Sequence, residues 1–328
     1  MIADKSARIT TRERPVRQLP AELPESRTVK VRAADGTVLH AEVFGPPEGY
    51  PIVLTHGFVC AIRAWSHQIA DLATDYRVIA FDHRGHGRSA VPRRGGYSLK
   101  HLASDLDCVL DATLAPHERA LIAGHSMGGM TIQAWSERYR HKVRRRADAV
   151  ALINTASGDL LDKIKLLSVP RGFSPARVVA GRTLISAVGG LPLPGAVRIP
   201  SRYLVAMMAV GAGADPAVVQ LVYELFAQTS PMGRGGCARM LIEEIGSRHL
   251  NLEGLTVPTL VIGSEHDRLT PISQARNLAR TAPNVVDLVE LPGGHCSMLE
   301  QPDEVNRQLR ALAEASIERQ ARVSLISS

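Results

Sequence analysis

The sequence of 328 residues predicts an α/β protein, with a mostly parallel central sheet that carries helices on both faces. Short apolar runs typical of buried strands alternate with amphipathic segments, which is the pattern of successive strand–helix units. The hydrophobic content of 45% is ample for one large core, and no segment repeats another.

The predicted elements follow one another along most of the chain. The first two strands, 28–34 and 37–44, are joined at Asp35-Gly36, a dipeptide typical of hairpin turns. Hydrophobic periodicity then predicts strand 51–55, helix 62–73, strand 77–81, helix 99–112, strand 119–123, helix 127–140, strand 147–154, strand 257–264 and strand 285–291.

The most specific local signal is a G-x-S-x-G pattern at residues 124–128. It follows an apolar run and opens a helical pattern, and this strand–turn–helix setting is the one in which the pattern marks a nucleophile. We expect the tight turn to strain the backbone of Ser126 and to project its hydroxyl from the end of the sheet. Ser126 is therefore the candidate nucleophile.

An acid and a histidine follow in the order that this chemistry requires. Asp267 comes just after the predicted strand 257–264, and His295 lies on a glycine-rich loop after strand 285–291. A serine hydroxyl needs a base to take its proton, and a carboxylate orients the imidazole that does so. Glu265 competes with Asp267 for the role of the acid, and Asp267 is preferred.

The segment His56-Gly57-Phe58 follows strand 51–55 and resembles an oxyanion loop. The backbone N–H groups of Phe58 and Met127 are the predicted donors to the oxyanion. His56, Gly57, Trp65 and His125 are further candidates for contact with a substrate. Both histidines also fit a structural role, and Trp65 fits either a pocket wall or a helix cap.

These segments together resemble the α/β-hydrolase superfamily, in particular its branch of serine esterases, non-haem haloperoxidases and epoxide hydrolases. The resemblance covers about residues 29–315 and is carried by His56-Gly57-Phe58, 82–89, 124–129, 267–271, and Gly294-His295 with 300–302. Epoxide hydrolases of this kind have an aspartate at the position that the candidate nucleophile occupies in the G-x-S-x-G turn. Because this chain has Ser126 there, acyl transfer to water is the expected chemistry.

The resemblance also implies the domain organisation, because this superfamily inserts a lid between its sixth and seventh core strands. Residues 157–252, rich in glycine, proline and apolar side chains, interrupt the strand pattern and contain helix-like stretches at 176–188 and 202–210. We therefore expect a flexible arm at 1–27, the α/β-hydrolase core at 28–156 and 253–328, and a helical lid at 157–252.

The expected activity is hydrolysis of carboxylic esters with small to medium apolar acyl groups, through an acyl-enzyme on Ser126. The same triad also serves C–C bond hydrolases, lactonases, thioesterases and perhydrolases, and the motifs do not separate these. A ligand-binding, receptor-like protein with little turnover is a second alternative. An enzyme acting at a lipid surface is a third.

Composition bears on partners and location. The net charge is +7, and part of it lies at 138–146, which fits a solvated helix end or a weak contact with a membrane surface. An aromatic content of 4% argues against a nucleic-acid stacking platform. No Cys/His spacing or G-x-G-x-x-G pattern indicates a metal or cofactor.

The chain has four scattered cysteines, and two of them, Cys60 and Cys296, lie near the proposed catalytic segments. The N-terminal segment has no apolar core typical of a secretion signal. We therefore expect reduced thiols, a cytoplasmic location and a monomer or homodimer.

Overall fold

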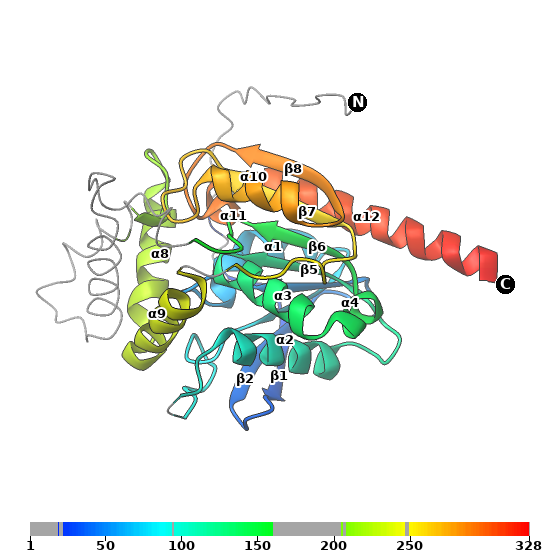
Figure 1. Ribbon diagram of the computed structural model, residues 1–328, viewed down its shortest axis with the longest axis horizontal. Coiled ribbons are helices and arrows are strands. Elements are labelled where there is room, and N and C mark those ends of the chain that lie inside the picture. The colour runs from blue at the N-terminus through cyan, green and yellow to red at the C-terminus, as the bar shows by residue number, and fades with distance from the viewer. Residues whose placement is uncertain are drawn as a thin grey trace, which may run out of the picture.

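The computed structural model describes residues 19, 22–93, 95–159, 205, 208–246 and 249–327, and its centre is an eight-stranded sheet in the order β1-β2-β4-β3-β5-β6-β7-β8 (Figure 1). β1 and β2 pair antiparallel, as do β2 and β4, and every other neighbouring pair is parallel. The predicted mostly parallel sheet is confirmed. The strands are β1 (Ser26–Arg32), β2 (Val38–Phe44), β3 (Pro51–Thr55), β4 (Arg77–Phe81), β5 (Ala120–His125), β6 (Ala147–Ile153), β7 (Thr259–Ser264) and β8 (Val285–Leu291).

Helices cover both faces of the sheet, as predicted. The core on one face takes its side chains from α2 (Leu99–Thr113), α3 (Met127–Arg138) and α10 (Ile272–Thr281). The core on the other face takes them from the 3₁₀ helix η1 (Ile62–Trp65), α1 (Ser66–Leu72), α11 (Ser297–Glu300) and α12 (Pro302–Ser327). α12 continues beyond the body of the protein towards the C-terminus (Figure 1).

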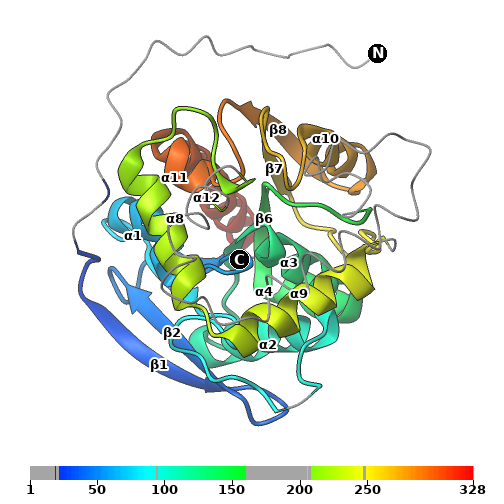
Figure 2. The same cartoon turned by 90° about the vertical axis from the view of Figure 1, so that its left-hand side faces the viewer.

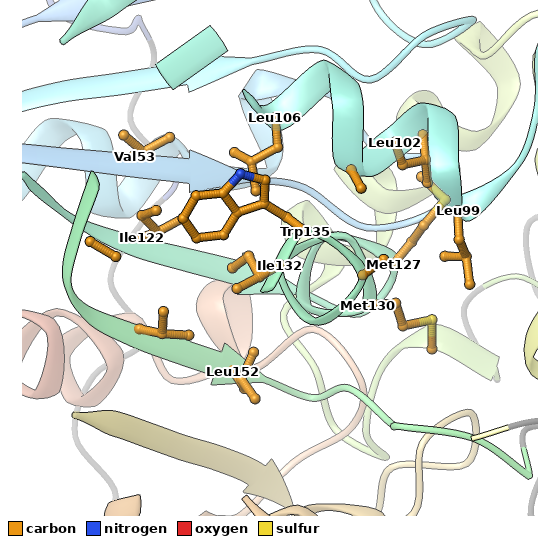
Figure 3. Close-up of a cluster of buried hydrophobic side chains, with 14 of the residues drawn as sticks. Val53, Leu99, Leu102, Leu106, Ile122, Met127, Met130, Ile132, Trp135 and Leu152 are labelled. Carbon is orange, nitrogen blue, oxygen red and sulfur yellow. The ribbon is translucent and has the colours of Figure 1, made fainter. Parts of the chain in front are cut away.

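Strand alternation divides the apolar side chains between these two cores. In β3, Val53 faces the α2 and α3 side, whereas Ile52 and Leu54 face the α1 and α12 side. Trp135 of α3 is fully buried near Ile122 in the first core, and its indole N–H donates to Asp107 at 3.2 Å (Figure 3). Burial of one such large side chain contributes on the order of 1.5–3 kcal/mol, so these two layers hold the sheet firmly.

The structure differs from the sequence prediction at several boundaries, among them those of the first strand, predicted at 28–34 and observed at Ser26–Arg32. The predicted helix 62–73 is η1 followed by α1. The predicted helix 127–140 ends at Arg138, since Tyr139 leaves helical geometry at φ −118° and ψ 43°, and a separate helix α4 (Arg140–Arg146) follows. The strand predicted from residue 257 begins at Thr259, because Pro258 has no N–H to donate to a neighbouring strand.

Two helices of the chain inserted between β6 and β7 are described, α8 (Pro216–Gln228) and α9 (Pro231–Ile245). Each begins with a capping residue followed by a proline: the Asp215 side chain accepts the Ala217 N–H, and the Ser230 side chain accepts the Gly233 N–H. Apolar side chains of α8 join the core on the face covered by α1, and those of α9 join the core on the face covered by α2. The two helices therefore extend across the end of the sheet (Figure 2).

The predicted helical stretch 176–188, most of 202–210 and most of the arm 1–27 lie outside the described residues. The division of the chain into an arm, a two-part core and a lid therefore stays a prediction. Within the described part of the chain, no helix is both long and apolar enough to span a membrane.

Candidate active site

Ser126 occupies the turn between β5 and α3, with the strained backbone angles φ 52° and ψ −117°. Its N–H donates to the Ile153 carbonyl at 3.0 Å, and the Thr155 hydroxyl donates to its carbonyl at 2.7 Å. A Cβ at Gly128 would lie 2.1 Å from the Thr55 carbonyl oxygen, so only glycine allows the helix to approach β3 this closely. The surrounding backbone therefore holds the unusual serine conformation in place.

Asp267 and His295 form a buried pair on the loops after β7 and β8. His295 Nδ1 lies 2.8 Å from Asp267 Oδ2, and the backbone N–H groups of Leu269 and Thr270 each donate to Oδ1 at 2.8 Å. Burial by itself raises the pKa of Asp267, but the adjacent His295 and the hydrogen bonds outweigh it, so the pKa lies below its usual range. Glu265 is exposed. Of the two candidates for the acid, Asp267 is the one in contact with His295.

Asn154 is a site residue that the sequence analysis missed. It follows β6 with φ 44°, and its amide donates to Asp267 Oδ2 at 3.0 Å and to Ser264 Oγ at 2.9 Å. The Ser297 hydroxyl donates to its side-chain oxygen. An asparagine directly after a buried strand was the available signal, because asparagine tolerates the left-handed conformation. Asn154 and the Thr270 hydroxyl, at 2.8 Å, complete the hydrogen bonds to the acid.

His125 connects the turn of Ser126 to the loop of His295. Its Nε2–H donates to the His295 carbonyl at 2.9 Å, and the two ring centroids are 4.8 Å apart. Burial lowers the pKa of His125 to about 3, so the ring is neutral at ordinary pH. Trp65 is fully buried in the α1 core, 6.5 Å from the His125 ring. The contacts of His125 with His295 and with Trp65 support the local structure. A role in binding substrate stays a prediction for His125 and for Trp65.

The loop after β3 lies directly against the serine turn. A Cβ built on Gly57 would lie 2.7 Å from His125 Nδ1 and 3.2 Å from Ser126 Cβ, so a larger residue would push the two segments apart. The N–H groups of Phe58 and Met127 donate to no acceptor in the described part of the chain. They are therefore free to serve a substrate oxygen.

Buried histidines hold the loop after β3 in place through hydrogen bonds to its backbone. His56 Nδ1 donates to the Gly57 carbonyl at 2.7 Å, and its Nε2 accepts the His83 N–H at 3.0 Å. His86 Nε2 accepts the N–H of Val59, a residue with a φ of 51°, at 3.2 Å. Burial lowers the pKa of His83 to about 3 and of His86 to about 4, and holds that of His56 well below its usual value. Neutral rings keep the acceptor nitrogens that these bonds need.

The structure brings the loops of the candidate nucleophile Ser126 and of the Asp267–His295 pair together through the contact between His125 and His295. Ser126 Oγ and His295 Nε2 make no hydrogen bond with any described residue, and such bonds often tighten only when substrate binds. Within the described residues, no three His, Cys, Asp or Glu side chains converge as metal ligands. The sheet and the loops at its carboxyl edge are those of an α/β hydrolase.

The chain belongs to the α/β-hydrolase fold family, whose model matches residues 50–302. Its sequence is 30% identical over 274 residues to a Variovorax paradoxus protein provisionally named the carbamate hydrolase RutD, covering 83% of this chain and 94% of that protein. It is 26% identical over 279 residues to 3-oxoadipate enol-lactonase 2 of Acinetobacter baylyi, covering 85% of this chain and 94% of that protein.

Solved structures agree with this assignment. The enol-lactonase from Burkholderia xenovorans LB400 superimposes with a TM-score of 0.66 at 28% identity, covering 87% of this chain and 99% of that one. The family and these relatives support a hydrolase.

Proposed function

We propose that the protein is a serine hydrolase that cleaves carboxylic esters with small to medium apolar acyl groups. The observation that carries the proposal is the contact of 2.8 Å between Asp267 and His295. His125, next to Ser126 in the chain, donates to the His295 carbonyl and so holds the loop of His295 against the turn of Ser126. This arrangement joins a base, oriented by a carboxylate, to a strained serine at the end of a parallel sheet.

The proposed reaction proceeds in two halves. His295 takes the proton of Ser126 Oγ, and Oγ attacks the ester carbonyl carbon while the N–H groups of Phe58 and Met127 hold the oxyanion. The C–O bond breaks and His295 returns the proton to the departing alcohol. A water deprotonated by His295 then attacks the acyl carbon, and the acid leaves as Ser126 recovers its proton. Asp267 orients His295 and stabilises its charged form throughout.

Lactone hydrolysis is the second candidate, favoured by two relatives named as enol-lactonases. A lactone is a cyclic ester, so the same residues perform the same steps, except that the alcohol stays attached to the acid. The shape of the binding pocket decides between the two substrate classes. C–C bonds, thioesters and perhydrolysis are further alternatives on the same triad, and a receptor with little turnover is another.

The lipid-surface alternative gains little from the arrangement of the basic residues. Most basic residues of the patch 138–146 are on α4, which leads directly into the amino end of β6. The candidate site lies at the opposite end, where the parallel strands have their carboxyl ends. Figure 1 accordingly shows α4 far from α8 and α9. Lys142 and Arg146 pair with Asp111, which neutralises part of the patch.

The direct test is hydrolysis of p-nitrophenyl esters from acetyl to palmitoyl, together with a panel of lactones, by the wild type and Ser126→Ala. We expect turnover that is fastest for short to medium acyl chains and a loss of about 10³-fold or more in kcat/KM for Ser126→Ala. Faster turnover of lactones would place the protein with the lactonases. Activity that survives in Ser126→Ala, or a wild type inert on both panels, would contradict the proposal.

A further inference from the structure

Glu300, the last residue of α11, is half-buried, and among the described residues its carboxylate accepts hydrogen bonds from backbone N–H groups alone. Its Oε2 accepts the N–H of Gly294 at 2.9 Å and that of Gly211 at 2.8 Å, and its Oε1 accepts the N–H of Cys296 at 3.1 Å. No cation pairs with it among the described residues. The carboxylate thus holds the residues on both sides of His295, and also a residue of the segment that leads into α8.

The two backbones meet where the carboxylate lies. A Cβ built on Gly294 would be 2.3 Å from the Gly211 nitrogen, and one built on Gly211 would be 2.9 Å from the Gly294 nitrogen and from Glu300 Oε2. Side chains at either position would separate the segments. The inserted chain therefore packs onto the loop of His295 where Gly211 meets Gly294. The Glu300 carboxylate accepts the N–H groups of both glycines and so links the two segments.

We propose that Glu300 is a positioning residue that fixes the loop of His295 and couples it to the docking of the inserted segment before α8. The proposal rests on the proposed function, in which His295 is the base. Glu300 touches neither Ser126 nor Asp267 through any hydrogen bond, so it acts through the backbone of the loop.

The energetics favour such a role over one in general stability. A charge that is partly removed from water is costly unless it is compensated, and here the N–H groups of three residues provide the compensation. Burial raises the pKa of Glu300, and those N–H groups oppose the effect. Because an isolated apolar side chain would avoid this cost, the carboxylate is best explained by the geometry that it imposes on Gly211, Gly294 and Cys296.

Amide hydrogen exchange tests the contact without any substrate. In Glu300→Ala, the amides of Gly211, Gly294 and Cys296 lose their acceptor, and we expect each to exchange about ten times faster or more. Glu304→Gln, a charge removed from an exposed ion pair one turn later, is the matched control and leaves these amides unchanged. Unchanged exchange in Glu300→Ala would overturn the proposal, whatever the protein hydrolyses.

Kinetics test the positioning of the base. We expect kcat to fall about 10²-fold in Glu300→Ala with KM nearly unchanged, since a small displacement of a catalytic group can cost that much. Glu300→Gln keeps one acceptor oxygen and recovers part of the loss, to about 10-fold below wild type. A general loss of structure would instead lower the amount of active enzyme, which titration of Ser126 with a fluorophosphonate measures. Wild-type kcat in a folded Glu300→Ala would overturn the proposal.

A separate variant tests the coupling between the segment before α8 and the loop of His295. Gly211→Ala places a methyl on the inserted segment at its contact with Gly294 and Glu300, and Ala212→Ser changes an exposed neighbour as its control. We expect Gly211→Ala to speed exchange at Gly294 and Cys296 as well as at its own position, and to lower kcat. If only the Gly211 amide responds, the coupling is wrong. A wild type that hydrolyses no ester or lactone overturns the proposed function, and the exchange data then still decide whether Glu300 joins the two segments.

Discussion

Asn154 Nδ2 lies 3.0 Å from Asp267 Oδ2, the same oxygen that contacts His295 Nδ1 at 2.8 Å. One carboxylate oxygen thus receives hydrogen bonds from the candidate base and from an asparagine that precedes the whole insertion in the chain. The asparagine keeps the carboxylate charged and correctly turned. It also fastens the end of β6 to the loop after β7.

The first prediction concerns this asparagine. Asn154→Gly keeps a residue that tolerates the φ of 44° and removes only the side-chain bonds. We expect about 1.5–3 kcal/mol less free energy of unfolding, because a buried hydrogen bond to a charged group is lost. Urea unfolding measures the change, and an unaltered midpoint and slope would contradict it. kcat/KM should fall as well, by about 10-fold or more.

The second prediction separates the two acidic candidates. Asp267→Asn leaves the shape of the site intact but favours the wrong tautomer of His295, and we expect kcat to fall by about 10⁴-fold. Glu265→Gln, an exposed carboxylate two residues earlier, is the matched control and keeps wild-type rates. Steady-state ester hydrolysis compares them. The reverse pattern would transfer the role of the acid to Glu265.

The third prediction concerns the oxyanion loop. In Gly57→Ala the added methyl would press on His125 Nδ1 and on Ser126, so the loop must shift away from the nucleophile. We expect kcat/KM to fall by about 10²–10³-fold, the loss typical of a missing oxyanion donor. Gly36→Ala places the same methyl in the β1–β2 turn with nothing within 4 Å, at a φ of 86° that strains alanine but lies outside the candidate site, so its kcat/KM should match wild type. Equal losses in both variants would refute this account.

The fourth prediction is a loss of stability in acid from the buried histidines His56, His83, His86 and His125. In the unfolded chain they take up protons near an ordinary pKa of about 6.5. In the folded protein burial holds His83 and His125 to a pKa of about 3, and His86 to about 4. Below pH 6.5 the unfolded state therefore binds more protons. The stability present above that pH is lost as the pH falls towards 4.

Each of these histidines should contribute a slope of about 1.4 kcal/mol per pH unit to the free energy of unfolding between pH 6 and pH 4.5. Urea unfolding across that range measures the total slope. His83→Gln should lower it by one such contribution, whereas His117→Gln, at an exposed position, should leave it unchanged. A stability independent of pH in this window would show that the rings are already protonated in the folded protein.

The fifth prediction concerns the thiols beside the site. Burial raises the pKa of Cys60 to about 12 and that of Cys296 well above its usual value, and a thiol rather than a thiolate reacts poorly. We expect iodoacetamide to leave both unmodified, and activity intact, until the protein is unfolded. Cys108, which is half-buried, should react first. Mass spectrometry of alkylated peptides checks the order, and early loss of activity with modification of Cys296 would contradict it.

Local patterns in the sequence determined the α/β class, the existence of every strand in the described sheet, and the strand–turn–helix setting of Ser126. Each of these depends on residues within a few positions of one another, where hydrophobic period and turn chemistry act directly. The order of Ser126, Asp267 and His295 along the chain then indicated which residues form the candidate triad. The errors at Tyr139 and Pro258 were errors of boundary, which hydrophobic period does not specify.

Only the tertiary structure decided which side chains complete the site. Asn154 meets Asp267 across 113 positions of sequence, and Gly211 meets Glu300 across 89. Such contacts leave no periodic signal, because they exist only once parallel strands have aligned their carboxyl ends at one edge. The same alignment selects Asp267 over Glu265, since two residues of separation after β7 turn one carboxylate inward and leave the other in solvent.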